Sequence, residues 1–470
     1  MSAVASPPGK PDQEIELYEI HKKIHVRAVS GSFATWRWIL VWFTQAIYYG
    51  LCWLPWNGRQ AVLFDLVERK FYIFGLVLWP QDVFFLAILL IISAYALFLF
   101  TAIGGRLWCG YACPQTVYTE IFMWIEQKIE GDQKARRKLD EAPMGARKFM
   151  LRAAKFGAWG LFAFWTGFTF VGYFTPIKTV WEEIWTFSLG PWEIFWILFY
   201  GAFTYSFAGH LREQVCKYMC PYARFQGVMF DPDTLVITYD EERGEPRGSR
   251  GKKVDHKAKG LGDCVDCGIC VQVCPTGIDI RQGLQYECIG CAACIDACDQ
   301  VMEKVGYPKG LIRYSTEHAI AEHWGWREIV AHIVRPRVII YTSILSLIVI
   351  AFIWGLATKP SLRVDVIRDR ATLAREVEGG LIENVYRLQV MNVSEVAHRY
   401  AVSVSGLDGV ALATDTQILE LAPATTKSFT VQVRVPPESG KKGSNTIFFD
   451  VKSMADEKVA VHEKASFIVP

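Results

Sequence analysis

The sequence predicts a multidomain membrane protein with three parts: a bundle of transmembrane α-helices, a cysteine-rich insert and a C-terminal all-β domain. At 470 residues with 51% hydrophobic and 14% aromatic content, the chain is too long for one ordinary domain and too apolar for a purely soluble protein. Eight of its 13 cysteines lie between positions 264 and 298. After residue 357 the chain changes to short alternating runs that are typical of β-strands.

Five apolar stretches are long enough to cross a membrane. A hydrocarbon core of roughly 30 Å takes about 20 apolar residues in a helix, because every backbone polar group must be satisfied internally. Tryptophan and tyrosine crowd the ends of these stretches, where an amphipathic ring is favoured at the headgroup level. The predicted spans are residues 36–56, 83–103, 156–174, 192–209 and 338–357.

Lysine and arginine predict the orientation, because they are retained on the cytoplasmic side of a membrane. The loop 104–155 carries ten of them, whereas the connection 175–191 carries only Lys178. The first 35 residues show no pattern of a cleavable signal peptide. We therefore expect a multi-pass protein of a bacterial inner membrane with its N-terminus in the cytoplasm and its C-terminal domain in the periplasm.

These boundaries divide the chain into five regions. A cytoplasmic segment 1–35 precedes four transmembrane helices within 36–209, which include the cytoplasmic loop 104–155. A cytoplasmic insert 210–337, a fifth helix 338–357 and a periplasmic domain 358–470 follow. The formal net charge is only +2, so no global basic field indicates nucleic acid, and we expect none as a partner.

The insert contains two cysteine runs of the same spacing, C-x2-C-x2-C-x3-C. This is the pattern of a two-cluster bacterial ferredoxin, in which three thiolates of each run bind one [4Fe-4S] cubane and the fourth crosses to the other cubane. The spacing suits a cubane because a loop around it presents a sulfur at every third residue. We assign the first cluster to Cys264, Cys267, Cys270 and Cys298, and the second to Cys288, Cys291, Cys294 and Cys274.

Other features of the insert favour iron–sulfur clusters over the alternatives. Gly268, Gly277 and Gly290 suit a backbone that approaches a cluster closely, since glycine adopts conformations closed to other residues. Pro275 follows the first run, but Asp299 stands where the second run would have proline. Zinc usually takes paired C-x2-4-C units, and a disulfide framework is rare in a reducing compartment.

The region 358–470 predicts an immunoglobulin-like sandwich. Short runs at 362–367, 386–393, 399–404, 428–435 and 446–451 alternate apolar and polar residues between turn signals. About 110 residues with several evenly spaced strands fit such a sandwich, here without the cysteine pair of antibody domains.

Two C-x3-C-P motifs follow the second and fourth predicted spans. A spacing of i and i+4 would place both sulfurs of a pair on one helical face, and the proline would end or redirect the helix. Two such faces meeting at the membrane surface would bring four thiols together. The pairs are Cys109 with Cys113, and Cys216 with Cys220.

Several interpretations of these four thiols remain open. Thiolates favour Cu(I), and another iron–sulfur centre would use the same ligands. A redox-active dithiol is a further possibility, and small buried cysteines can also serve packing alone.

The order of these features resembles that of the cytochrome c oxidase accessory protein family, known as CcoG, FixG or RdxA. Both cysteine runs, both C-x3-C-P pairs, five spans and a terminal β domain carry the resemblance, which covers nearly all of the chain. The ferredoxin motif alone is shared with a great many proteins, and the C-x3-C-P pairs would also fit membrane ferredoxins of periplasmic nitrate and nitrous oxide respiration. The external immunoglobulin-like domain distinguishes the accessory protein family from these ferredoxins. Asp299 in place of proline does not change the predicted cluster ligands.

The resemblance implies a role in the biogenesis of cbb-type haem–copper oxidase. Its implied activity is that of a cupric reductase, an oxidoreductase that reduces Cu(II) to Cu(I) for the oxidase copper site. Expected cofactors are two [4Fe-4S] clusters, with copper as a further ligand. Expected partners are a cytoplasmic electron donor and either cytochrome c oxidase subunits or copper-delivery proteins, and a homo-oligomer remains open.

Two other functions remain alternatives. One is a respiratory membrane ferredoxin that takes electrons from quinol. The other is a non-catalytic scaffold whose external domain docks oxidase subunits.

Overall fold

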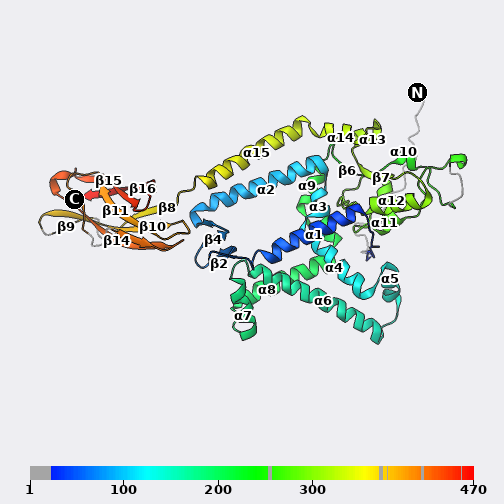
Figure 1. The fold of residues 1–470 in the computed structure, drawn as a ribbon, viewed down its shortest axis with the longest axis horizontal. Coiled ribbons are helices and arrows are strands. Elements are labelled where there is room, and N and C mark those ends of the chain that lie inside the picture. Colours follow the sequence, from blue (N-terminus) through cyan, green and yellow to red (C-terminus); the bar gives the residue numbers. More distant parts are fainter. Residues whose placement is uncertain (1–22, 252–256, 370–373, 378, 414–417, 457) are drawn as a thin grey trace, which may run out of the picture. The chain divides into compact units, whose positions relative to one another are not determined.

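The structure is a computed structural model that describes residues 23–251, 257–369, 374–377, 379–413, 418–456 and 458–470. These residues, drawn as a ribbon in Figure 1, fall into two compact units by their internal contacts. Unit 1 comprises Met1–Phe43, Phe100–Ala163 and Phe203–Val334, and unit 2 comprises Thr44–Leu99, Phe164–Ala202 and Arg335–Pro470, each within the described ranges. Every cysteine except Cys52 belongs to unit 1.

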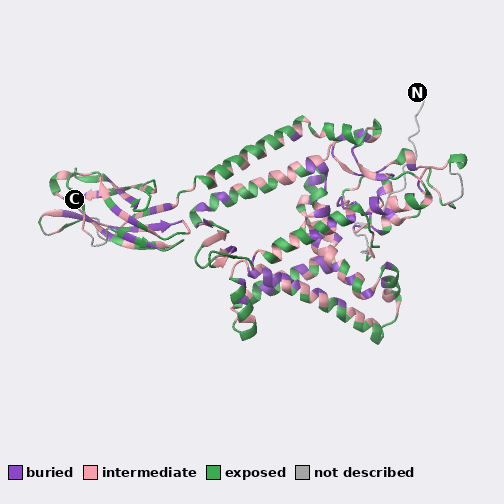
Figure 2. Ribbon diagram, in the orientation of Figure 1, coloured by how far each residue is buried: buried purple, intermediate pink, exposed green. Residues whose placement is uncertain are grey.

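Three helical stretches in the described chain are long and apolar enough to cross a membrane: Pro80–Gly104, Pro191–Leu211 and Pro336–Ala357. Each begins with proline, which lacks the N–H that a first helical turn would leave without a partner. They contain α2 (Val83–Gly104), α8 (Pro191–Thr204) with the π-helical segment Tyr205–Leu211, and α15 (Pro336–Ala357). Only 6% of the most apolar 18-residue window is buried within the protein in the first and third spans, so the apolar side chains of these windows require lipid (Figure 2).

The other two predicted spans are also helical, as α1 (Ser32–Gly50) and α6 (Ala146–Val171). Neither is among the three stretches that meet the length and hydropathy of a span, so the count of five stays a prediction. Helix α1 ends at Gly50, six residues before the predicted end, and the chain turns into β1 (Pro55–Trp56). Proline 55 lacks the amide hydrogen that a continuing helix would need.

Short helices in unit 1 surround both C-x3-C-P motifs. The first motif connects α3 (Leu107–Tyr111) to α4 (Pro114–Glu130), and α5 (Gln133–Glu141) follows. The second motif connects the π-helical turn Val215–Met219 to α9 (Pro221–Met229).

The cysteine-rich insert of unit 1 is built on a two-stranded antiparallel sheet. Strand β6 (Val236–Tyr239) pairs with β7 (Ile312–Ser315), and two helices that carry cysteines, α11 (Ile269–Gln272) and α12 (Ala293–Val305), lie between them in the chain. Helix α10 (Glu241–Gly244) follows β6 directly. Ile237 and Tyr239 alternate into the core with Cys264 and Cys270, which explains the strand. Helices α13 (Glu317–Ala321) and α14 (Trp326–Ile333) lead to α15.

Unit 2 contains short strands that we did not predict between α1 and α2. Asn57 and Gly58 both have positive φ, as a tight hairpin turn requires, and the Asn-Gly pair is a signal for such a turn. The strands are β1 and β2 (Arg59–Gln60), then the sheet of β3 (Val62–Asp65), β4 (Lys70–Ile73) and β5 (Leu76–Leu78). Helix α7 (Ile177–Thr186) separates α6 from α8.

The C-terminal region is an all-β domain of two sheets, as predicted. One sheet has the order β12-β14-β10-β8 with β9 on β10, and the other has the order β13-β11-β15-β16. Tyr386, Tyr400 and Phe449 are fully buried in its core. The strands are β8 (Leu362–Arg368), β9 (Arg375–Val377), β10 (Leu381–Asn392), β11 (His398–Ser405), β12 (Ala411–Leu412), β13 (Ile418–Leu421), β14 (Thr426–Val435), β15 (Gly443–Ser453) and β16 (Ala460–Val469).

Candidate functional site

The first predicted set of cluster ligands surrounds one pocket of the insert. Its wall contains three cysteines of the first run. The fourth is the last cysteine of the second run, which lies in α12. Cys264 and Cys270 are buried, whereas Cys267 is exposed. The set is Cys264, Cys267, Cys270 and Cys298.

The second predicted set surrounds another pocket. Here the last cysteine of the first run joins three cysteines of the second run, and Cys270 also touches the wall. Cys291 is buried, and neither Cys288 nor Cys294 is exposed. The set is Cys274, Cys288, Cys291 and Cys294.

Asp299, the departure from the ferredoxin pattern, has a structural role in the insert. Its Oδ1 accepts a hydrogen bond from the backbone N–H of Gly310 at 2.9 Å. This bond ties α12 to the turn before β7. Cys298 still faces the first pocket, so proline is not required at position 299 for that placement.

Both pockets fit iron–sulfur clusters by the chemistry of their donors. Within the part of the chain that the structure describes, no three His, Cys, Asp or Glu side chains converge closely enough to hold a single metal ion. A cubane offers a separate iron to each cysteine, so four thiols spread around a pocket are the donor set that it takes. Gly268, Gly277 and Gly290 all have positive φ, which lets the backbone fold closely around the cysteines.

Burial raises the thiol pKa in both pockets. The pKa of Cys270 rises to about 11, and those of Cys288 and Cys298 rise to about 12 because burial disfavours the thiolate. Neighbouring cysteines add to the rise. Without a metal these thiols stay protonated at neutral pH, so cluster binding and proton release are coupled.

The two C-x3-C-P motifs meet in unit 1, although neither forms the continuous helical face that we predicted. The first cysteine of each pair lies in a short helical turn and the second is the N-cap of the next helix, because the proline starts a new helix. All four thiols nevertheless lie close enough together to raise one another's pKa values. We call Cys109, Cys113, Cys216 and Cys220 the four-thiol site.

Hydrogen bonds between the motifs hold the four-thiol site together. Upstream of Cys109, Arg106 donates from Nη2 to the carbonyl of Ala223 at 2.6 Å. After Cys113, Gln115 donates from Nε2 to the carbonyl of Arg212 at 3.1 Å. Each motif is thereby fastened to the other on both sides of its cysteines.

A buried ion network anchors the second motif. Arg212 donates to Glu126 of α4 at 2.8 Å, and Arg136 of α5 donates to the same carboxylate oxygen at 3.3 Å. Lys155 of α6 lies 2.9 Å from Glu130. Burial alone would raise the pKa of Glu126, but the charges of Arg212, Arg136 and Lys155 lower it to about 2.

The thiols of this site are also shifted. Burial raises the pKa of Cys109 and of Cys216 to about 12 and raises that of Cys113, and the neighbouring thiols reinforce the rise. Cys109 donates from Sγ to Oε1 of the fully buried Gln226 at 3.5 Å. A soft cation that binds these thiols has to displace their protons, so its binding is coupled to proton release.

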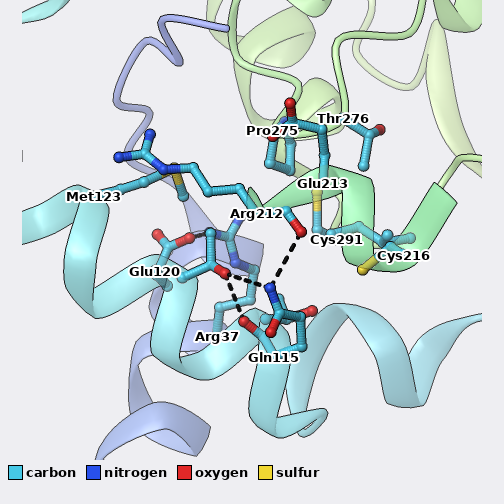
Figure 3. A pocket seen from close by; sticks show the side chains of 13 residues that line it. Arg37, Gln115, Glu120, Met123, Arg212, Glu213, Cys216, Pro275, Thr276 and Cys291 are labelled. Carbon is cyan, nitrogen blue, oxygen red and sulfur yellow. Dashed lines mark hydrogen bonds and ion pairs between the residues drawn. The ribbon is translucent and has the colours of Figure 1, made fainter. Parts of the chain in front are cut away.

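The four-thiol site packs directly against the second cysteine run. A Cβ atom at Gly110 would stand 2.7 Å from the carbonyl oxygen of Gly290 and 3.0 Å from Cα of Cys291, so only glycine permits this approach. Cys216 and Cys291 line one small pocket, shown from close by in Figure 3. The pocket also contains the ion pair of Arg37 with Glu120.

Sequence reasoning missed the polar residues around the thiols. Arg106, Gln226 and Glu126 carry no spacing motif, and their roles depend on which helices meet. A partial signal existed for Arg106, because each C-x3-C-P pair has a glycine and a basic or imidazole residue upstream.

Family models match three segments of the chain. A 4Fe-4S dicluster domain matches residues 211–317, and an IG-like fold at the C-terminal of FixG matches residues 352–470. A 4Fe-4S binding domain matches residues 86–131, a segment whose cysteines are Cys109 and Cys113.

Three curated relatives are similar over most of the chain. "Nitrogen fixation protein FixG" of Rhizobium meliloti is 37% identical over 83% of this chain and 80% of its own length. "Protein RdxA" of Cereibacter sphaeroides is 37% identical, over 84% of each chain. "Protein RdxB" of the same organism is 39% identical over 88% of this chain and 87% of its own.

Proposed function

This chain belongs to the FixG family of iron–sulfur membrane proteins, and on that premise we propose that it reduces Cu(II) to Cu(I) during biogenesis of a cbb-type cytochrome c oxidase. The single observation that carries the proposal is the contact of the four-thiol site with the second cysteine run through Gly110. Thiolates favour Cu(I), so a thiol site beside an electron carrier is suited to this substrate.

The ligand sets of the two clusters are those that line the two pockets. A bound [4Fe-4S] cluster accepts and donates one electron at a potential set by its surroundings. Reduction of each Cu(II) ion takes one electron, which a reduced cytoplasmic flavoprotein or ferredoxin would supply. Exposed Cys267 marks the edge of the insert at which such a donor would approach.

In this proposal copper is the substrate of the four thiols, which would move closer together to bind it, because no three such side chains in the described residues are close enough to hold one metal ion. Cys109 and Cys113 come from one motif, and Cys216 and Cys220 from the other. The thiols lose their protons when copper binds. The resulting thiolates are polarizable and prefer the soft Cu(I) ion to Cu(II). The insert would face the cytoplasm of a bacterium and the β domain the periplasm. Partners would be oxidase subunits or copper-delivery proteins.

The proposal can be tested with anaerobically purified protein that is reduced with dithionite, freed of excess reductant and mixed with Cu(II). A Cu(I)-specific chelator measures the product. We expect the double variant C216S/C220S to lose cupric reduction while both cluster EPR signals remain. The variant C52S, which alters the one cysteine of unit 2, is the matched control and should retain wild-type rates. An unchanged rate in the double variant would remove the four-thiol site from the mechanism.

A third iron–sulfur centre is another candidate for the four-thiol site. The 4Fe-4S binding model that matches residues 86–131 favours it, because that segment holds the first C-x3-C-P motif. Iron analysis separates the candidates: copper as substrate predicts about eight irons per chain, and a third cubane predicts about twelve.

Quinol oxidation is a second candidate function, favoured by a pocket beside the second cysteine run. Trp38 and Trp124 line this pocket with their rings edge to face at 6.4 Å, and Gln127 adds a polar group. Pro275 and Ala293, neighbours of Cys274 and Cys294, line its other side. Reduction of the clusters by a quinol analogue, with no response to Cu(II), would favour this function.

A further inference from the structure

Arg106 is a buried cation for which no carboxylate partner is found among the residues that the structure describes. It is 5% exposed, its Nη2 donates to a backbone carbonyl, and its Nε has no hydrogen-bond partner. Other buried arginines nearby are neutralised: Arg37 pairs with Glu120, and Arg136 pairs with Glu126. A buried and unpaired guanidinium is costly unless an anion faces it.

Cysteines of both groups lie near Arg106. A Cβ atom at Gly290, inside the second cysteine run, would stand 3.1 Å from the carbonyl oxygen of Arg106 and 3.6 Å from its Cβ. Cys109 follows Arg106 by three residues, and the arginine charge acts on Cys109, Cys216 and Cys288. The residue therefore lies between the second predicted cluster and the four-thiol site.

A second buried donor points to the same anion. Gln226 is fully buried and its Oε1 accepts from Cys109, while its Nε2 lies near Tyr222 but makes no hydrogen bond of good geometry. Arg106 and Gln226 thus each have an N–H group without a good acceptor beside the same thiols. A metal–thiolate centre carries net negative charge and would supply the missing acceptor.

We propose that Arg106 is the countercharge shared by the second cluster and the four-thiol site, and that it raises the reduction potential of the second cluster above that of the first. The inference rests on the proposed electron transfer. A nearby cation favours the more negative, reduced form of a centre, so electrons are drawn from the exposed end of the insert toward the four-thiol site. The transfer moves one electron, with no proton and no bond made or broken, and Arg106 acts on it through the field alone.

Redox titration of the full chain, followed by EPR of the reduced clusters, tests this inference. In R106Q we expect one of the two midpoint potentials to become more negative while the other stays at the wild-type value. R106K keeps the charge and should keep both potentials. R137Q removes an exposed arginine of α5 and should change neither. Unchanged potentials in R106Q, or an equal shift in R106K, would overturn the inference.

If R106Q binds its clusters incompletely, the iron content of R106K shows whether the charge or the shape of arginine is required. If R106K then binds all of its iron and keeps both wild-type potentials, the positive charge at position 106 is what the clusters require. If R106K also loses iron, the shape of the arginine side chain is what matters, and the inference is contradicted. The titration reads the potentials without copper. A protein that shows the shift but does not reduce Cu(II) therefore contradicts the proposed function and leaves the role of Arg106 intact.

Discussion

The two groups of cysteines in unit 1 differ in how their positions are specified. The ferredoxin-like runs lie within 35 consecutive positions, 264–298, and five of their eight cysteines belong to the core of the insert with β6, β7 and α12. The four-thiol site joins segments about 100 residues apart, and it depends on Gly110, on bridging hydrogen bonds and on the ion network around Glu126. Local spacing specifies the first group, and tertiary packing specifies the second.

The largest expected effect tests the independence of the two groups. Cys291→Ser removes a ligand of the second predicted cluster, so iron should fall from about eight to about four per chain. Cys109→Ser should leave about eight irons if copper is the substrate of the four-thiol site. Iron and acid-labile sulfide analysis measures both. A full iron complement in Cys291→Ser would contradict the ligand assignment.

The ion network should matter more to the four-thiol site than to the insert. Glu126→Gln leaves the buried Arg136 and the partly buried Arg212 without their shared carboxylate, at a cost of about 3–5 kcal/mol. Because the pKa of Glu126 is lowered to about 2 from 4.5, its stabilisation is present above pH 4.5 and is lost as the pH falls toward 2. Thermal unfolding in detergent across this pH range measures the loss, which should be absent in Glu126→Gln.

Gly110 tests the contact between the two groups. Gly110→Ala places a methyl group 2.7 Å from the carbonyl oxygen of Gly290, so we expect a loss of about 1–3 kcal/mol and slower cupric reduction at full iron content. Gly157→Ala is the matched control, because no atom lies within 4 Å of its added Cβ. Equal rates in the two variants would show that the contact does not serve electron transfer.

Asp299 should have the smallest effect. Asp299→Ala removes one hydrogen bond to Gly310 and should cost about 1 kcal/mol without loss of iron. Denaturant unfolding and iron analysis would measure the two quantities. Loss of iron would mean that the residue after the second run supports Cys298 directly.

The sequence allowed the β domain and the crossed cysteine sets to be predicted because both depend on short-range patterns. Alternation predicted strands near β8, β10, β11, β14 and β15, and C-x2-C-x2-C-x3-C placed Cys298 and Cys274 on opposite pockets. The C-x3-C-P motifs were harder to interpret, since Pro114 and Pro221 start new helices where we expected one continuous face. Gln226 could not be found from the sequence, and Arg106 had only the partial signal of a basic residue upstream of its motif, because only the meeting of distant helices places them beside thiols.

One measurement tests the central claim most directly: protein reduced anaerobically, freed of excess reductant and mixed with Cu(II) in the presence of a Cu(I) chelator. Our account predicts that the Cu(I) formed equals the electrons lost by the clusters, one for one, and that C291S, which lacks the cluster beside the four-thiol site, forms little Cu(I). Reoxidation of the clusters without Cu(I), or equal Cu(I) formation by protein stripped of iron, would contradict it.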